Sequence, residues 1–264
     1  MRDGLRLYFR RPFGFTGLFL IFLIGAMLLM AVPLVGGVLG MATLPLLTLG
    51  FMAATRAALR DESMGPMVFL APLRRDAPGR GALLKLCLGY GVASVAVLML
   101  SHWADGGAFE RLQQAMAKAD VGREELESAL GDPLLLTGLL LRVGLIVAVS
   151  IPYWHAPALA HWGRQSATQA LFSSTLALWN ARGAFFVYSL GWTVAVALFG
   201  AIAAVLFSLL GLRQLVGAIG LPAGLIFSSA FYVSLWFSFV DSFGTEDDDG
   251  VRPEGETPAT IPRA

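Results

Sequence analysis

One apolar run near the end of the chain constrains the fold more than any other feature. From Gly183 to Val240 the sequence runs for 58 residues with a single charged side chain, Arg213. About 20 apolar residues suffice for a helix to cross a bilayer, so this run holds two membrane-spanning helices and a turn. Across the whole chain 14% of residues are charged, against about 25% in soluble domains. We therefore expect an integral membrane protein.

Uninterrupted apolar runs indicate helices, because the strands of a membrane barrel alternate apolar and polar residues. We predict an all-α, polytopic transmembrane helix bundle of about six spans, with interfacial helices. The predicted spans are Phe13–Val32, a second that follows the turn at 33–37 and ends near Thr55, Ala82–Ser101, Leu134–Ala156, Ala184–Leu210 and Leu215–Val240. No Asp or Glu lies inside these ranges, which counts against proton- or sodium-coupled transport.

The lysines and arginines in the loops, in the tails and at one span end predict the orientation. Fourteen fall on the side of both termini and four on the other side. Positive residues in short loops stay in the cytoplasm, so we predict a bacterial inner-membrane protein with both termini cytoplasmic. The fourteen are Arg2, Arg6, Arg10, Arg11, Arg56, Arg60, Arg74, Arg75, Arg80, Lys85, Arg164, Arg182, Arg252 and Arg263.

Residues 1–12 are predicted to form a cytoplasmic interfacial helix. Arg2, Arg6 and Arg10 recur at every fourth position, and apolar side chains occupy another face. Such a helix lies in the headgroup layer and is attracted to anionic lipid. Residues 164–180 repeat the pattern more weakly. The alternative is that these arginines only set the topology and recognise no particular lipid.

The predicted six-span membrane domain covers residues 13–240 and includes one long outer loop. This periplasmic loop, residues 102–133, carries seven acidic and three basic residues. Its apolar residues recur at helical spacing, so we expect a short helical hairpin that caps the bundle. Residues 241–264 are acidic and rich in Pro and Gly, a composition that predicts a disordered cytoplasmic tail.

Arg142 is the side chain most suggestive of a site, because ionisable residues inside a membrane are costly and often functional. It lies inside the fourth predicted span, and Pro45 and Pro222 fall at similar depths in the second and sixth. Prolines free backbone carbonyls that can line a cavity. These three residues could form a small anion- or headgroup-binding cavity. Alternatively, Arg142 reaches the outer headgroups and the prolines are packing kinks.

The residues that usually carry chemistry are sparse. His155 and His161 are expected on the cytoplasmic side and His102 on the other, so they cannot share a zinc ion. The one cysteine, Cys87, lies in an apolar run and is expected to be a small buried or lipid-facing hydrophobic residue. We predict no catalytic residue, no cofactor and no metal, and a net charge of +1 gives no indication of nucleic-acid binding.

Pairs of small residues four apart predict close helix packing. They could hold the bundle together or mediate self-association, and the first role is favoured because each pair lies in a span with neighbours. The pairs are Gly36 and Gly40, Gly89 and Ala93, Gly200 and Ala204, and Gly220 and Gly224.

Two stretches carry a resemblance to known proteins. One is LRLYFRRP at 5–12, and the other is APALAHW at 156–162, followed by ALFSS at 170–174. Together they resemble a family of uncharacterised multi-pass inner-membrane proteins of Burkholderia-type β-proteobacteria, over most of the chain. The Ala-Pro-Ala-Leu stretch is also distantly similar to the membrane domain fused to some glycerophosphodiester phosphodiesterases. The catalytic barrel of those enzymes has no room here, so the resemblance implies no catalytic residue.

The leading interpretation is a non-enzymatic inner-membrane protein, structural or accessory, that contacts lipids or a partner protein at its cytoplasmic interface. Its expected partners are membrane lipids, together with a membrane-protein partner or a second copy of the chain. The alternative is a small permease or lipid-handling carrier with an intramembrane cavity near Arg142. An intramembrane enzyme would need a polar catalytic pair, and the spans offer only scattered Ser, Thr and Tyr.

Overall fold

The computed structural model describes residues 1–117, 123–210 and 215–244, and this part of the chain is helical with no strand. Most helices are long and apolar, and the short ones connect them. Their bounds are α1 Arg2–Arg10, α2 Pro12–Met30, α3 Gly36–Ala42, α4 Leu44–Leu59, α5 Met67–Leu70, the 3₁₀ helix η1 Ala71–Leu73, α6 Arg80–Asp105, α7 Ala108–Ala117, α8 Arg123–Leu130, α9 Pro133–Tyr153, α10 Ala156–His161, α11 Ala167–Asn180, α12 Arg182–Leu209 and α13 Leu215–Phe243.

Six helical segments in the described ranges are long and apolar enough to cross a membrane, which confirms the predicted all-α polytopic fold. Two of them are composite, because α3 continues into α4 and α9 into α10. Each break has a proline in the first turn of the second helix, Pro45 in α4 and Pro157 in α10. Proline lacks a backbone N–H but fits a first turn, so it starts a new helix at these points.

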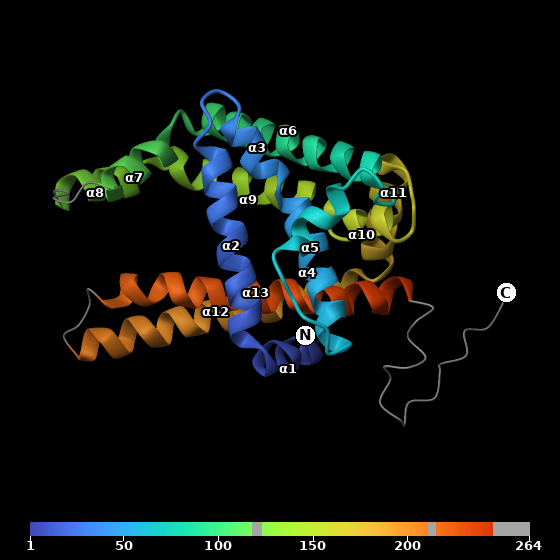
Figure 1. Cartoon of the computed structure of the whole chain (residues 1–264). Coiled ribbons are helices and arrows are strands. Elements are labelled where there is room, and N and C mark those ends of the chain that lie inside the picture. Colours follow the sequence, from blue (N-terminus) through green and yellow to red (C-terminus); the bar gives the residue numbers. More distant parts are fainter. Residues whose placement is uncertain (118–122, 211–214, 245–264) are drawn as a thin grey trace.

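The spans cross one another instead of running as parallel rods. In Figure 1, α12 and α13 form one hairpin, α6 and α9 lie on the opposite side of the molecule, and α2 and α3–α4 connect the two layers. α13 contacts α1, α2 and α4, and α6 contacts α3 and α9. Because α2 and α13 cross, they can touch along only part of their lengths.

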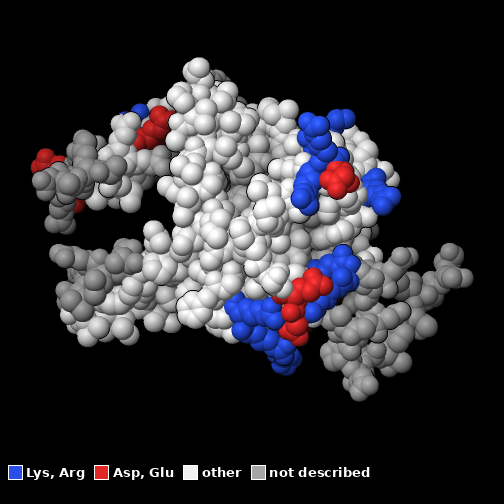
Figure 2. Space-filling model, in the orientation of Figure 1, with Lys and Arg blue, Asp and Glu red and all other residues white. Residues whose placement is uncertain are grey.

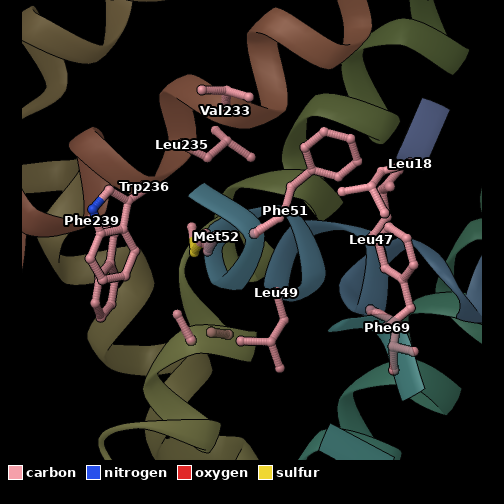
Figure 3. Packing of buried hydrophobic residues seen from close by; sticks show 14 of the residues in the cluster. Leu18, Leu47, Leu49, Phe51, Met52, Phe69, Val233, Leu235, Trp236 and Phe239 are labelled. Carbon is pink, nitrogen blue, oxygen red and sulfur yellow. The ribbon is translucent and has the colours of Figure 1, made fainter. Parts of the chain in front are cut away.

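The buried core gathers around α4. Phe51 and Met52 have no exposed surface, and they face side chains from several other helices (Figure 3). Phe51 stacks on Phe15 of α2 at a centroid distance of 6.4 Å and lies 5.5 Å from the ring of Tyr232 in α13. α4 is thus enclosed by α2, α5 and α13.

This core lies at one end of the molecule, which also carries most of the basic side chains at the right and bottom of Figure 2. We call this end, formed by α1, α4, α5, α10, α11 and the C-terminal half of α13, the basic end. Along α13 the change occurs near Ser229, since all positions from there to Phe239 are buried or partly buried, whereas half of the described positions before it are exposed. α2 shows the reverse order, with Phe15 and Leu18 buried and most later positions exposed.

The opposite end, which we call the far end, is sparsely packed. α12 is tied to the rest of the protein near its start, where Phe185 contacts Trp154, Tyr188 hydrogen-bonds Ser234 and Trp192 is buried. Beyond Trp192, most of its side chains are exposed. Figure 2 shows the molecule hollowed on this side, between the α7 arm and the α12–α13 hairpin.

The third span extends further than predicted. α6 continues past Ser101 to Asp105 and ends at Gly106, which adopts the left-handed conformation with φ 54°. Glycine takes this conformation at helix ends without strain. The expectation that no acidic residue lies inside a span is therefore wrong, because Asp105 is the last residue of the third spanning helix and is fully buried. The predicted outer loop, residues 102–133, contains the helices α7 and α8.

At the C-terminus α13 continues to Phe243. Residues 245–264, the rest of the tail predicted to be disordered, lie outside the described residues. Arg213, which the sequence places between the fifth and sixth predicted spans, also lies outside them.

The small-residue pairs divide into two groups. A Cβ on Gly36 or Gly40 would overlap Met30 of α2, and one on Gly89 would come within 2.8 Å of the Tyr153 hydroxyl. These pairs hold helices of the same chain together, as favoured from the sequence. Gly200, Gly220 and Gly224 have no neighbouring atom within 4 Å of an added Cβ, so the favoured role is wrong for the pairs in α12 and α13.

Candidate functional site

Arg142 lies in α9 and is buried, with 8% of its surface exposed. Its Nη2 lies 3.6 Å from Oδ2 of Asp105 at the end of α6. Its guanidinium carbon lies 4.0 Å from the centre of the Phe109 ring in α7. Arg142 therefore joins three helices and has a buried counter-charge, which neither interpretation from the sequence included.

Asp105 is held in place by its surroundings. Its Oδ1 accepts a hydrogen bond of 2.8 Å from the backbone N–H of Gly107. Gly138 of α9 faces it, and a Cβ there would overlap the Asp105 side chain. The absence of a side chain at Gly138 thus allows α6 and α9 to approach closely enough for the charges to meet.

The pair is buried but incompletely hydrogen-bonded. Asp105 Oδ2 and Arg142 Nε have no hydrogen-bond partner in the described part of the chain. Removing two charges from water is costly, and attraction compensates fully only when geometry and further hydrogen bonds are favourable. The pair is therefore better suited to fixing the contact between α6, α7 and α9 than to adding much stability.

The three residues predicted to share a cavity lie on three different helices. Arg142 is in α9, Pro45 is buried at the start of α4 and Pro222 is exposed in α13. Among the described residues, Asp105 and Phe109 provide the charged and ring contacts of Arg142. A shared cavity of Arg142, Pro45 and Pro222 stays a prediction.

The α7 arm is fixed to the start of α9 by polar contacts. Arg111 donates hydrogen bonds of 2.8 Å to Asp132 Oδ2 and to the Gly106 carbonyl. Asp132 also accepts from the N–H of Leu134, which caps α9. The hydrogen bond from Arg111, followed by the one from Leu134, lowers the pKa of the Asp132 carboxyl.

The basic end has the larger charged surface. Exposed basic residues come from α1, from the end of α4, from the turn before α6, from the α10–α11 turn and from the starts of α6 and α12, and they collect over two areas of Figure 2. The exposed members are Arg2, Arg6, Arg10, Arg60, Arg74, Arg75, Lys85, Arg164 and Arg182. Acidic residues among them, such as Asp61 and Asp76, are fewer.

α1 is docked firmly onto this end. Its buried face consists of Gly4, Leu7 and Tyr8. A Cβ on Gly4 would lie 2.7 Å from the Cα of Ser234, so the α1 and α13 backbones are in direct contact. The Tyr8 hydroxyl hydrogen-bonds Thr16 of α2 at 2.8 Å. The sequence predicted the helix but not this docking.

Arg11 holds the α1–α2 junction against the end of α4. Its Nη2 donates to Asp61 Oδ1 at 2.7 Å, and its Nη1 donates to the Glu62 carbonyl at 3.1 Å. One of the arginines counted as a topology signal is therefore part of a structural contact.

The outward face of α1 forms an open groove. Its hollow has a volume of about 860 Å³ and is lined by Met1, Arg2, Leu5, Arg6, Phe9 and Arg10. Two rows run along it, one of arginines and one of apolar side chains, because both sets recur every four residues. The groove is therefore amphipathic.

His155 and His161 have structural contacts. His155 is fully buried, and its backbone N–H donates to Ser174 Oγ at 3.0 Å. Nδ1 of His161 lies 3.0 Å from the Pro78 carbonyl. Within the described residues no three His, Cys, Asp or Glu side chains gather in a group that could hold a metal. His155 thus joins the α9–α10 break to α11, and His161 joins the end of α10 to the turn before α6.

Sequence reasoning missed Asp105 because it ended the span at the polar residues that begin at Ser101. The signal that could have found it is Gly106-Gly107, since glycine commonly follows the last residue of a helix. It also missed the docking of α1, for which Gly4, in the middle of an otherwise bulky helix, was the available signal.

Comparison with known proteins supports the predicted class. The chain is 30% identical over 253 residues to a probable inner membrane protein of Burkholderia thailandensis, and the match covers 93% of this chain and 90% of the relative. No protein-family model matches the chain, and no solved structure matches it. These comparisons give no support to a relationship with the glycerophosphodiester phosphodiesterase membrane domain. This protein is a multi-pass inner-membrane protein and belongs to the same family as that probable inner membrane protein of Burkholderia thailandensis.

Proposed function

We propose that this protein is a non-enzymatic, structural or accessory component of the inner membrane, with its basic end and both termini in the cytoplasm. One observation carries the proposal: the exposed arginines gather at the end of the molecule that holds the buried core. A rigid, basic surface next to the headgroup layer is suited to holding anionic lipids or an acidic partner protein. Positive charge on one side of the spans favours the cytoplasmic orientation.

Site-directed labelling tests this orientation. Single cysteines replace Ser63 at the basic end and Ser128 in α8, both exposed, in a Cys87→Ser background. Intact cells with a permeabilised outer membrane are treated with a membrane-impermeant thiol reagent. We expect labelling of Ser128→Cys in these cells, and labelling of Ser63→Cys only after the inner membrane is opened. The opposite pattern would refute the proposal.

A lipid-handling carrier is the second candidate, favoured by the buried charge pair of Asp105 and Arg142 between α6 and α9. A carrier needs a water-filled path to Arg142. Single cysteines at positions 138 to 146 in the same background test this requirement. Labelling with helical periodicity would support a carrier, whereas protection across the whole window would support the accessory role.

A further inference from the structure

We propose that the groove on α1 is a binding site for an anionic phospholipid of the cytoplasmic leaflet, such as phosphatidylglycerol or cardiolipin. The lipid phosphate contacts Arg2, Arg6 and Arg10, and the first part of an acyl chain lies along Leu5 and Phe9. This inference rests on the orientation proposed above, because it places α1 at the cytoplasmic surface.

The groove is preformed because α1 cannot rotate freely. Gly4 lies directly on the α13 backbone at Ser234, and Tyr8 is 2% exposed and hydrogen-bonded to Thr16. Arg11 ties the end of α1 to the α4–α5 connection. With this face fixed inward, the arginine row must point outward. A preformed site loses less conformational entropy on binding than a helix that folds on the membrane.

The charges in the groove are available to a ligand. Arg2, Arg6 and Arg10 are exposed. Arg6 lies 3.8 Å from Asp3, and a solvent-exposed pair at this separation is weak. Neither Arg2 nor Arg10 forms an ion pair with any residue that the structure describes. Guanidinium groups bind phosphate oxygens through two parallel hydrogen bonds, so the row matches a phosphate-bearing headgroup.

The apolar row indicates a lipid in preference to a soluble anion. Phe9 is 68% exposed, and Phe13 at the start of α2 is 92% exposed. Phe9 lines the groove, and Phe13 lies in the first turn of the first span, which is apolar from Pro12 to Met30. A soluble phosphate would leave these rings uncovered, whereas a phospholipid covers them with its acyl chains.

Native mass spectrometry of the full-length protein in detergent tests the site. Phosphatidylglycerol, cardiolipin and zwitterionic phosphatidylcholine are titrated separately. The test variant carries Arg2→Gln, Arg6→Gln and Arg10→Gln. The control carries Arg74→Gln, Arg75→Gln and Arg164→Gln, three exposed arginines elsewhere on the basic end with the same change in charge.

We expect the test variant to bind the anionic lipids at least about tenfold more weakly, since it lacks all three guanidinium groups of the row that contacts the phosphate. The control should bind within about twofold of the wild type, and binding of phosphatidylcholine should not change. Equal losses in the test and control variants would overturn the proposal, because bulk charge would then explain the binding. Unchanged binding in both would also overturn it.

Two further variants distinguish a fixed lipid site from a flexible basic helix and from a soluble-anion site. Gly4→Val keeps every arginine but displaces α1 from α13, so it should weaken anionic-lipid binding; unchanged binding would contradict a preformed groove. Phe9→Ser should weaken binding of phospholipid and leave the weak binding of inorganic phosphate unaltered. If inorganic phosphate competes fully with lipid in the wild type, the groove is a soluble-anion site and the proposal fails. Circular dichroism checks that each variant is folded.

These results are independent of the proposed orientation. Lipid binding in detergent with inverted labelling in cells would retain the site and reject the cytoplasmic placement. Correct labelling without lipid binding would reject the site alone.

Discussion

The basic end and the far end of this protein are built from the same long helices, yet they are packed differently. At the basic end α4 is surrounded by aromatic rings from α2, α5 and α13. At the far end α12 and α13 touch each other, through Phe199 and Phe227 for example, and otherwise present apolar side chains outward. Mean hydropathy is lower for the well-buried spans, Gly36–Leu59 and Ile219–Phe243, than for the mostly exposed spans, Pro12–Met30 and Arg182–Leu209.

The comparison shows where specificity resides in such a fold. Lipid is as apolar as leucine, so burial of aliphatic side chains gives little force for helix association inside a bilayer. Contacts that hold helices together therefore come from close backbone approach, aromatic packing and polar pairs. The basic end has aromatic packing and the close Gly4–Ser234 contact, whereas the far end depends on the Asp105–Arg142 pair and its neighbours.

The largest expected effect is at the centre of the basic end. Phe51→Ala removes a fully buried ring and should cost about 3–5 kcal/mol of unfolding free energy, as large cavities in cores do. Phe186→Ala in α12 is the matched control, because this ring is 67% exposed, and it should change stability by no more than about 0.5 kcal/mol. Unfolding in mixed detergent micelles, followed by tryptophan fluorescence, measures both. Similar losses of unfolding free energy in the two variants would show that Phe51 and Phe186 are in equivalent surroundings.

The buried pair should give the next largest effect. Asp105→Asn leaves Arg142 buried without a counter-charge, which typically costs about 3–5 kcal/mol. We place it second because water can reach an outer helix end more easily than a packed core. The same unfolding measurement applies, and Asp76→Asn, at an exposed position, is the control.

A double variant sharpens the interpretation of this pair. Asp105→Leu combined with Arg142→Leu should recover most of the lost stability, since an apolar pair avoids the cost of burying two charges. If the double variant is as unstable as Asp105→Asn, the two side chains stabilise the fold by more than the neutralisation of each other's charge.

Substitution of glycines should also separate a packed helix contact from an open helix face. Gly40→Leu forces α3 away from Met30 and should cost about 1–3 kcal/mol, as overpacking does. Gly200→Leu meets open space and should be tolerated. Crosslinking of both variants in membranes provides the check on self-association: loss of a dimer in Gly200→Leu alone would show that a second copy covers the α12 face.

The smallest effect concerns Asp132. Its hydrogen bonds lower its pKa in the folded protein, so it stabilises the fold above the usual carboxyl pKa of about 4, and this contribution is lost as the pH falls through that range. The thermal midpoint of Asp132→Asn should therefore lie slightly below that of the wild type at pH 7, and the difference should narrow toward pH 3. A difference that grows on acidification would contradict the assigned pKa shift.

The sequence predicted insertion, span number and the site of the intramembrane arginine, because these depend on local composition. Runs of apolar residues located the six spans within a few residues, and Arg142 stood out as a charge within one of them. The partner of Arg142 was not predictable from span boundaries alone, because polar residues near Ser101 suggested an end before Asp105.

Contacts between distant segments could not be read from the sequence. Gly4 and Ser234 meet although they lie near opposite ends of the chain, and the same small-residue pattern is packed at Gly36 and Gly40 but open at Gly200. The small-residue pattern determines how closely a second helix can approach. The crossing of the helices determines which of the faces that carry small residues have a neighbouring helix.

A spin-label distance measurement on α6 and α12 tests the packing difference most directly. One label pair replaces Leu84 and Phe186 near the basic end, and the other replaces Met99 and Leu206 near the far end, all of them exposed positions. In lipid nanodiscs we expect a narrow distance distribution for Leu84 and Phe186 and a clearly broader one for Met99 and Leu206, because the α12–α13 hairpin has few contacts beyond Trp192. Equal widths for the two pairs would contradict the division into a packed basic end and a sparsely packed far end.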